Sequence, residues 1–194
     1  MSKAFDKINL NRLIDACKRI GIPQNALNLI YNLYSNQKAR IITAYGLTEP
    51  INLYSSIEQG ETYSPLLWKI YYDPILTFIN NKYQNSFLQI KSLSLIDQIF
   101  NKNLQPLTIP PLAFIDNTVW HYKNPTDLQN LLNDVSKLYQ INNIQVNPTK
   151  SDLLHINSNK TKLTPIPQIL FNNQPIYLCK PEEIIRYLGI YYDG

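Results

Sequence analysis

The chain has 194 residues, of which 44% are hydrophobic, and it carries a formal net charge of +4. A chain of this length and apolar content can bury a core, so we expect one domain, or one domain with a small appendage, and not disorder throughout. The modest positive charge is compatible with a polyanionic partner. Many unrelated proteins are equally basic, so the charge favours nucleic acid only weakly.

Cysteine usage and hydropathy exclude several classes of protein. Cys17 and Cys179 lie far apart and neither has a second cysteine at metal-binding spacing, so we expect two thiols in a reducing compartment. The first residues contain no apolar segment of a secretory signal, and no apolar run reaches the ~18 residues of a membrane span. The sequence therefore predicts a soluble intracellular protein with no membrane partner, without resolving nucleus from cytoplasm.

Two amphipathic helices are predicted first, over residues 10–20 and about 23–37. Gly21 is placed to end the first helix in a left-handed conformation, and Pro23 suits the first turn of the second. The apolar positions are Leu10, Leu13, Ile14, Cys17 and Ile20 in the first helix, and Ala26, Leu27, Ile30, Tyr31 and Tyr34 in the second.

A β-hairpin is predicted next, from strand-like runs over about 39–45 and 51–57 that are linked through Gly46 and Pro50. A helix follows over about 64–81, and Pro74 should kink it. Its predicted buried positions are Leu66, Leu67, Ile70, Tyr71, Ile75, Phe78 and Ile79. Residues 83–108 show no clear periodicity.

The sequence PLAFIDNTVWH at 111–121 predicts a strand, a two-residue turn at Asp116-Asn117 and a second strand. A helix over about 125–141 follows, with Leu128, Leu131, Leu132, Val135, Leu138 and Tyr139 directed inward. Further strands are predicted at 144–146, 152–156, 168–171, 175–179 and 185–192, with a hairpin turn at Asn172-Asn173. Helices mixed with antiparallel hairpins indicate an α+β domain.

Asp116 stands at the tip of a predicted apolar hairpin. By itself, turn geometry explains an aspartate there. The surrounding LAFIDNTVW, however, resembles the YADDT hairpin of reverse transcriptases, which is motif C of right-hand polymerases. In this resemblance Phe114 matches the family's aromatic residue, Asp116 matches the first metal-binding aspartate, and Asn117 stands where a second aspartate is usual.

Four more segments resemble reverse transcriptase motifs, in family order and at family spacing. They are KAFDKI at 3–8, just after the motif A aspartate, EQGETYSPLLWKIYYDPIL at 58–76 (motif B), NPTKSDLLHI at 147–156 (motif D) and RYLGIYYD at 186–193 (motif E). The phrases RIGIP and LIYNLYSNQ, between motifs A and B, look like the insert of LINE-type, non-LTR retrotransposon enzymes. The resemblance implies a partial fingers-palm domain over 1–194, with the end of motif A, the insert and motif B at about 1–82 and motifs C, D and E at 109–194.

The implied reaction is RNA-templated DNA synthesis, in which a DNA primer 3′-OH attacks the α-phosphate of a dNTP with the help of two Mg²⁺ or Mn²⁺ ions. Lys150 would protonate or neutralise the leaving pyrophosphate, although a solvated strand-edge lysine accounts for it equally well. The remaining roles implied by the family are metal binding for Asp116 and, more weakly, Asn117, nucleotide binding for Phe5, Gln59 and Gly60, and the primer grip for Tyr187, Leu188 and Gly189.

Three departures from the family pattern predict that this copy is truncated and inactive. Counting back from Phe5 puts the motif A aspartate one position before Met1, and Asp6 is better explained as part of a turn. Asn117 keeps an oxygen but lacks the charge of a second aspartate. Glu58 stands where an arginine or lysine is usual, and an acid there would repel a triphosphate.

Two alternatives to a reverse transcriptase fragment stay open from the sequence. The chain could be a nucleic-acid-binding or scaffold module that keeps the polymerase shape without its chemistry, or an unrelated α+β protein with chance motifs. We expect Trp68, Trp120 and Tyr71 to be core residues and not base-stacking platforms. Metal-dependent primer extension would fit only an enzyme, whereas a salt-dependent affinity for an RNA–DNA duplex would fit an enzyme fragment or a scaffold.

Overall fold

The computed structural model describes residues 8–52, 57, 61–90, 106–115, 117–156, 167–180 and 183–192. They belong to two compact units. The first unit comprises residues 1–82, 112–119 and 138–145, and the second comprises 83–111, 120–137 and 146–194.

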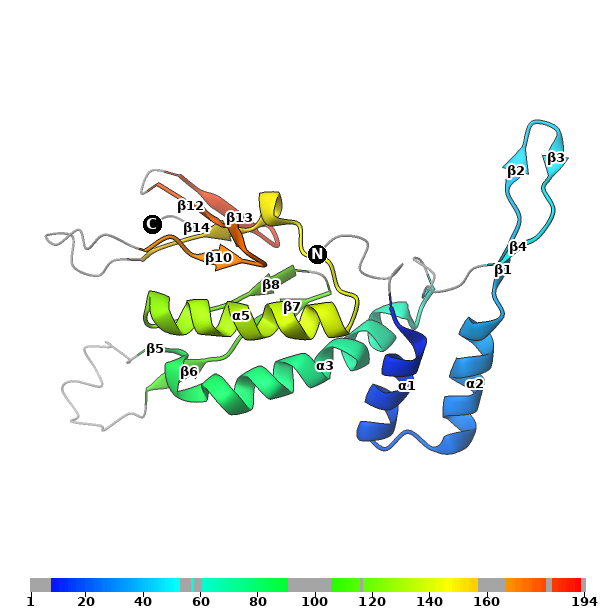
Figure 1. Ribbon diagram of the computed structural model, residues 1–194, viewed down its shortest axis with the longest axis horizontal. Helices are drawn as coiled ribbons and strands as arrows, with labels where there is room; N and C mark the ends of the chain where they lie inside the picture. Colours follow the sequence, from blue (N-terminus) through cyan, green and yellow to red (C-terminus); the bar gives the residue numbers. More distant parts are fainter. Residues whose placement is uncertain are drawn as a thin grey trace, which may run out of the picture. The chain divides into compact units, whose positions relative to one another are not determined.

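The first unit begins with two neighbouring helices, α1 (Leu10–Arg19) and α2 (Gln24–Ser35), shown in blue in Figure 1. The Asn9 side chain caps α1 by accepting a hydrogen bond from the amide of Arg12 at 3.2 Å. Gly21 ends the helix at φ +83°, and the amide of Ile22 returns to the carbonyl of Cys17. Both predicted helices are confirmed, although Pro23 is the residue before α2 and not part of its first turn.

An extended arm follows α2, and its pairing differs from the predicted hairpin. Its strands are β1 (Lys38–Ala39), β2 (Ile42–Thr43), β3 (Gly46–Leu47) and β4 (Ile51–Asn52). β1 pairs with β4 and β2 pairs with β3, so the chain reverses at residues 44–45 (Figure 1). The predicted strand at 39–45 therefore turns back within its own length, and Gly46 with φ +116° lies in β3 beside that turn.

The long helix α3 (Ser64–Tyr83) runs through Pro74 and supplies much of the first unit's core. Its buried hydrophobic residues are Leu67, Trp68, Tyr71, Tyr72, Ile75 and Ile79. The prediction was wrong for Leu66 and Phe78, which are exposed, and it missed Tyr72 on this face, whereas Trp68 was expected in the core. Arg19 of α1 forms an ion pair with Asp73 of α3.

The second unit packs its core on the helix α5 (Pro125–Ile141), of which residues 125–137 belong to it. The buried side chains are Phe87, Leu131, Leu132, Val135, Ile169 and Phe171. The side-chain amide of Gln129 bonds both the amide and the carbonyl of Leu170, at 2.8 and 2.9 Å, and so fastens the edge of strand β10 (Leu170–Phe171) to the helix.

The strands of the second unit are short, and their pairs are antiparallel except for β9 with β12, which is parallel. Its remaining elements are η2 (Gln84–Ser86), β5 (Leu88–Ile90), β6 (Leu107–Ile109), η3 (Pro148–Lys150), β9 (Asp152–Leu153), β10 (Leu170–Phe171), β11 (Gln174–Pro175), β12 (Tyr177–Leu178), β13 (Ile185–Tyr187) and β14 (Ile190–Tyr192).

Three details of the described chain after α5 bear on the predictions. The hairpin turn at Asn172-Asn173 is confirmed, with both residues at positive φ. Residues 144–146 form no strand, and 185–192 form a hairpin where a single strand was predicted. Helices and small, mainly antiparallel strand pairs agree with the α+β class.

No helix in the described ranges is both long and apolar enough to cross a membrane.

Candidate functional site

The hairpin around residues 115–116 belongs to the first unit. β7 (Leu112–Phe114) pairs antiparallel with β8 (Asn117–Val119), as Figure 1 shows, and Phe114 stands opposite Asn117. The predicted hairpin is confirmed, but its register differs: Asn117 is the first residue of β8, whereas the turn was expected at Asp116-Asn117. Asp116 itself lies outside the described residues.

The backbone just before Asp116 is unusual. Ile115 has φ +53°, a left-handed conformation that costs a β-branched residue about 1–2 kcal/mol. Its carbonyl accepts a hydrogen bond from Nε1 of Trp68 at 2.6 Å. Because Trp68 lies on α3 and is almost fully buried, this bond ties the turn to the interior of the unit.

A second bond from α3 reaches the other strand of the hairpin. The hydroxyl of Tyr72 lies 3.2 Å from Oγ1 of Thr118 and also forms a hydrogen bond with the hydroxyl of Tyr139. Tyr72 and Tyr139 are both buried, and burial is the first cause of the raised pKa of each, about 12 for Tyr72. The three hydroxyls therefore stay protonated and form a neutral cluster beneath the hairpin.

The neighbouring tyrosine on α3 ties the same helix to two further segments. The hydroxyl of Tyr71 donates to the carbonyl of Asn142 and accepts the amide of Asn9 at 3.4 Å. The rings of Trp68 and Tyr72 stack with their centroids 5.9 Å apart and an interplanar angle of 14°. Trp68 and Tyr71 are core residues, as predicted.

A hydrogen bond also anchors the start of α3. The hydroxyl of Tyr34, at the end of α2, donates to Oε2 of Glu61 at 2.7 Å. Burial, followed by the Glu61 carboxylate, raises the pKa of Tyr34. Glu61 lies three residues before the first residue of α3, so this contact ties the approach to α3 to the end of α2.

A comparison with known families identifies the family of the chain. The family model described as "Reverse transcriptase (RNA-dependent DNA polymerase)" matches residues 1–192. The chain belongs to the reverse transcriptase family. The match includes the β7–β8 hairpin, α3 and four of the five segments that resemble motifs A to E in full, and it covers the fifth, 186–193, up to residue 192.

Several site residues expected of a reverse transcriptase lie outside the described part of the chain. They are Phe5, Gln59, Gly60 and Asp116. Of the proposed metal ligands, Asn117 is described, and it lies exposed at the start of β8 in the first unit.

The other expected reverse transcriptase residues belong to the second unit. Lys150 is exposed at the end of η3. Tyr187, Leu188 and Gly189 lie together at the turn between β13 and β14, where Leu188 and Gly189 both have positive φ. In the same hairpin the guanidinium of Arg186 lies 5.8 Å from the ring centroid of Tyr191.

The described side chains do not by themselves fit the Mg²⁺ or Mn²⁺ that the family resemblance implies. Within the described ranges, no group of three or more His, Cys, Asp or Glu could hold a metal ion. Asn117 offers a neutral amide oxygen, whereas these hard cations prefer carboxylates.

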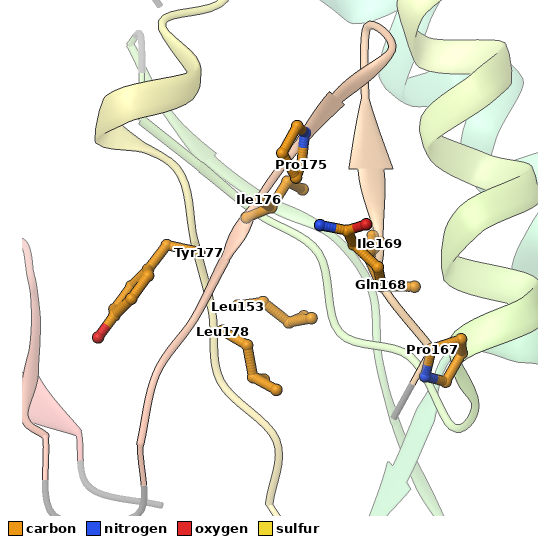
Figure 2. Close-up of a pocket in the computed structure, with 8 residues that line it drawn as sticks. All are labelled: Leu153, Pro167, Gln168, Ile169, Pro175, Ile176, Tyr177 and Leu178. Carbon is orange, nitrogen blue, oxygen red and sulfur yellow. The ribbon is translucent and has the colours of Figure 1, made fainter. Parts of the chain in front are cut away.

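A hollow of about 500 Å³ in the second unit is a second place to look for a site. Figure 2 shows Leu153 and Leu178, from the paired strands β9 and β12, next to each other in its wall, with Ile169 and Gln168 opposite. None of the described residues that line it is charged. Such a lining does not suit a nucleotide or a nucleic-acid backbone, so the hairpin remains the candidate site.

Sequence reasoning missed the bonds that support the hairpin. Trp68 and Tyr72 are four residues apart on α3, so they share a helix face. This spacing within the motif B segment was the available signal. Tyr139 was expected to point inward. Thr118 gave no signal, because a threonine in a strand needs no polar partner.

Proposed function

We propose that this domain is the palm and partial fingers of a non-LTR, LINE-type retrotransposon reverse transcriptase. In such an enzyme the β7–β8 hairpin would contribute Asp116 as a carboxylate ligand to template-directed DNA synthesis. The observation that supports this best is the hairpin itself, with its left-handed residue at 115 and its two bonds to α3. The phrases RIGIP and LIYNLYSNQ, in the insert between motifs A and B, support the non-LTR assignment.

The roles proposed for the other residues follow the chemistry of nucleotide addition. Divalent cations stabilise the attacking and leaving oxygens in this reaction. Phe5, Gln59 and Gly60 would contact the incoming dNTP and Lys150 the leaving pyrophosphate. Tyr187, Leu188 and Gly189 would hold the primer end, because their tight turn presents backbone groups to it.

We further propose that the 194-residue polypeptide alone does not extend a primer. A two-metal centre needs carboxylates converging from adjacent strands. In this hairpin the position after Asp116 is the neutral Asn117, and no acidic cluster occurs among the described residues. A nucleic-acid-binding module without chemistry is the alternative that the same observation favours.

Primer extension tests the proposal directly. The assay combines the polypeptide with an RNA template, a DNA primer, dNTPs and Mg²⁺ or Mn²⁺, and includes Asp116→Ala and Asp15→Ala variants. Asp15 is an exposed carboxylate on α1, so its variant controls for the loss of one charge. We expect no extension from any of the three. Extension that Asp116→Ala abolishes and Asp15→Ala retains would overturn the claim of inactivity and support the role of Asp116.

A binding titration separates a domain that still binds nucleic acid from a relic that has lost this binding. We expect the wild-type chain to bind an RNA–DNA duplex, and the logarithm of its association constant should fall linearly with log[salt], because phosphate contacts release counterions. Folded protein that shows no duplex binding even at low salt would contradict the proposed partner.

A further inference from the structure

We infer that Trp68 and Tyr72 are positioning residues of this reverse transcriptase, which hold the backbone on the two sides of Asp116 from one face of α3. This inference rests on the proposed function, because the turn has a chemical role only if Asp116 does. Neither residue would touch a substrate. Each would act through the hairpin that carries the carboxylate.

The first contact fixes the carbonyl that precedes Asp116. Trp68 is 1% exposed, and its indole N–H donates to the carbonyl of Ile115 at 2.6 Å. Ile115 holds a left-handed φ of +53°, which a β-branched residue keeps only when its surroundings enforce it. The short hydrogen bond from the buried, stacked ring of Trp68 provides this constraint.

The second contact fixes the strand that follows Asp116. The hydroxyl of Tyr72 bonds the side chain of Thr118, two residues beyond Asp116. Tyr139 bonds the same Tyr72 hydroxyl from α5 and limits where it can point. Thr118 also stands opposite Ala113 in the hairpin register, so the contact restrains both strands.

The two contacts act as a pair because of helix geometry. Residues 68 and 72 are separated by about one helical turn and lie on one face of α3. Their partners, Ile115 and Thr118, flank the turn from its two ends. A shift of α3 would therefore carry both ends of the turn with it. In this arrangement the motif B helix and the motif C turn would move together as one rigid element.

Amide hydrogen exchange of the full chain, followed by NMR, tests the first contact. Trp68→Phe keeps an aromatic ring but removes the indole donor. We expect exchange in β7 and β8 to rise about tenfold, as for the loss of one hydrogen bond, with exchange in α1 and α2 unchanged. Trp120→Phe removes the chain's other indole donor and should change nothing in the hairpin.

The second contact is tested by rescue. Thr118→Val keeps the shape of the side chain but removes the hydroxyl, whereas Thr118→Ser keeps the hydroxyl. We expect Thr118→Val and Tyr72→Phe to speed exchange in the hairpin to a similar degree, and Thr118→Ser to retain protection close to that of wild type. A merely structural role would instead raise exchange across the whole first unit and would not depend on which Thr118 variant is present.

The outcomes separate this inference from the proposed function. Hairpin exchange that is unchanged in Trp68→Phe and Tyr72→Phe would overturn the inference, as would wild-type hairpin amides that exchange at the rate of an unstructured peptide. Neither result bears on duplex binding. Conversely, a chain that binds no duplex but shows the expected local exchange would refute the proposed function and leave the contacts established.

Discussion

Replacing Tyr72 by phenylalanine should destabilise the first unit by about 1–2 kcal/mol, because it removes one buried hydroxyl and its two hydrogen bonds. A single net hydrogen bond contributes about 0.5–1.5 kcal/mol, so losing two sets an upper limit of about 3 kcal/mol. The ring stays in place and no cavity forms. The remaining hydroxyls of Thr118 and Tyr139 can still bond to each other. We therefore expect a loss in the lower half of the range of about 1–3 kcal/mol that two bonds would give.

The corresponding double-mutant cycle sharpens this expectation. Tyr139→Phe alone should cost a similar amount, for the same reason. The double variant should cost less than the sum of the two, by about 0.5–1.5 kcal/mol, because removing both partners of a bond strands fewer polar groups.

Equilibrium urea unfolding at neutral pH, followed by circular dichroism, measures these differences, with an unchanged m-value as the sign that only stability has changed. Tyr31→Phe is the matched control, since that tyrosine is exposed on α2 and should stay within about 0.5 kcal/mol of wild type. Costs of Tyr72→Phe and Tyr139→Phe that add within about 0.3 kcal/mol would refute the hydroxyl cluster as a coupled unit.

Three further predictions concern other parts of the chain. Burial lowers the pKa of His121, so it contributes stability that is present above pH 6.5 and lost as the pH falls below it. His121→Gln should reduce the fall in melting temperature between about pH 8 and about pH 5, and an unchanged pH dependence would contradict this role. Ile115→Asn should be at least as stable as Ile115→Val in urea, since asparagine tolerates positive φ and valine does not; a less stable asparagine variant would contradict a strained turn. Tyr83→Phe should lose about 1 kcal/mol of unfolding free energy because its hydroxyl donates to Asp134 at 2.6 Å, and an equal loss in an Asp134→Ala background would show that the bond contributes nothing.

Local sequence determined the elements whose signals lie within a few residues. α1 begins after the capping Asn9 and ends at Gly21, and Asn172-Asn173 makes its turn with both residues at positive φ. α5 follows its leucine periodicity. The reverse transcriptase family could also be predicted from the sequence, because motif spacing is a property of the chain itself, and the family match over residues 1–192 confirms it.

Sequence did not reveal two other reversals of short strands. Residues 39–45 and 185–192 each look like one strand, since apolar and β-branched residues fill both, yet each contains a reversal. In 185–192 the reversal occurs at Leu188-Gly189, where a leucine accepts positive φ beside a glycine. Pairing partners decide such cases, and a residue's neighbours along the chain do not reveal its neighbours across a ladder.

Tertiary contacts likewise determined which face of α3 is buried. Phe78 and Tyr72 both suit a core by composition, but Phe78 is exposed and Tyr72 is buried because the hydroxyls of Thr118 and Tyr139 give the Tyr72 hydroxyl its partners. The sequence by itself determined that a hairpin carries Asp116. Contacts from Trp68 and Tyr72, which are 47 and 46 residues from their partners, decided how that hairpin is held, because only folding brings such distant groups within hydrogen-bond reach.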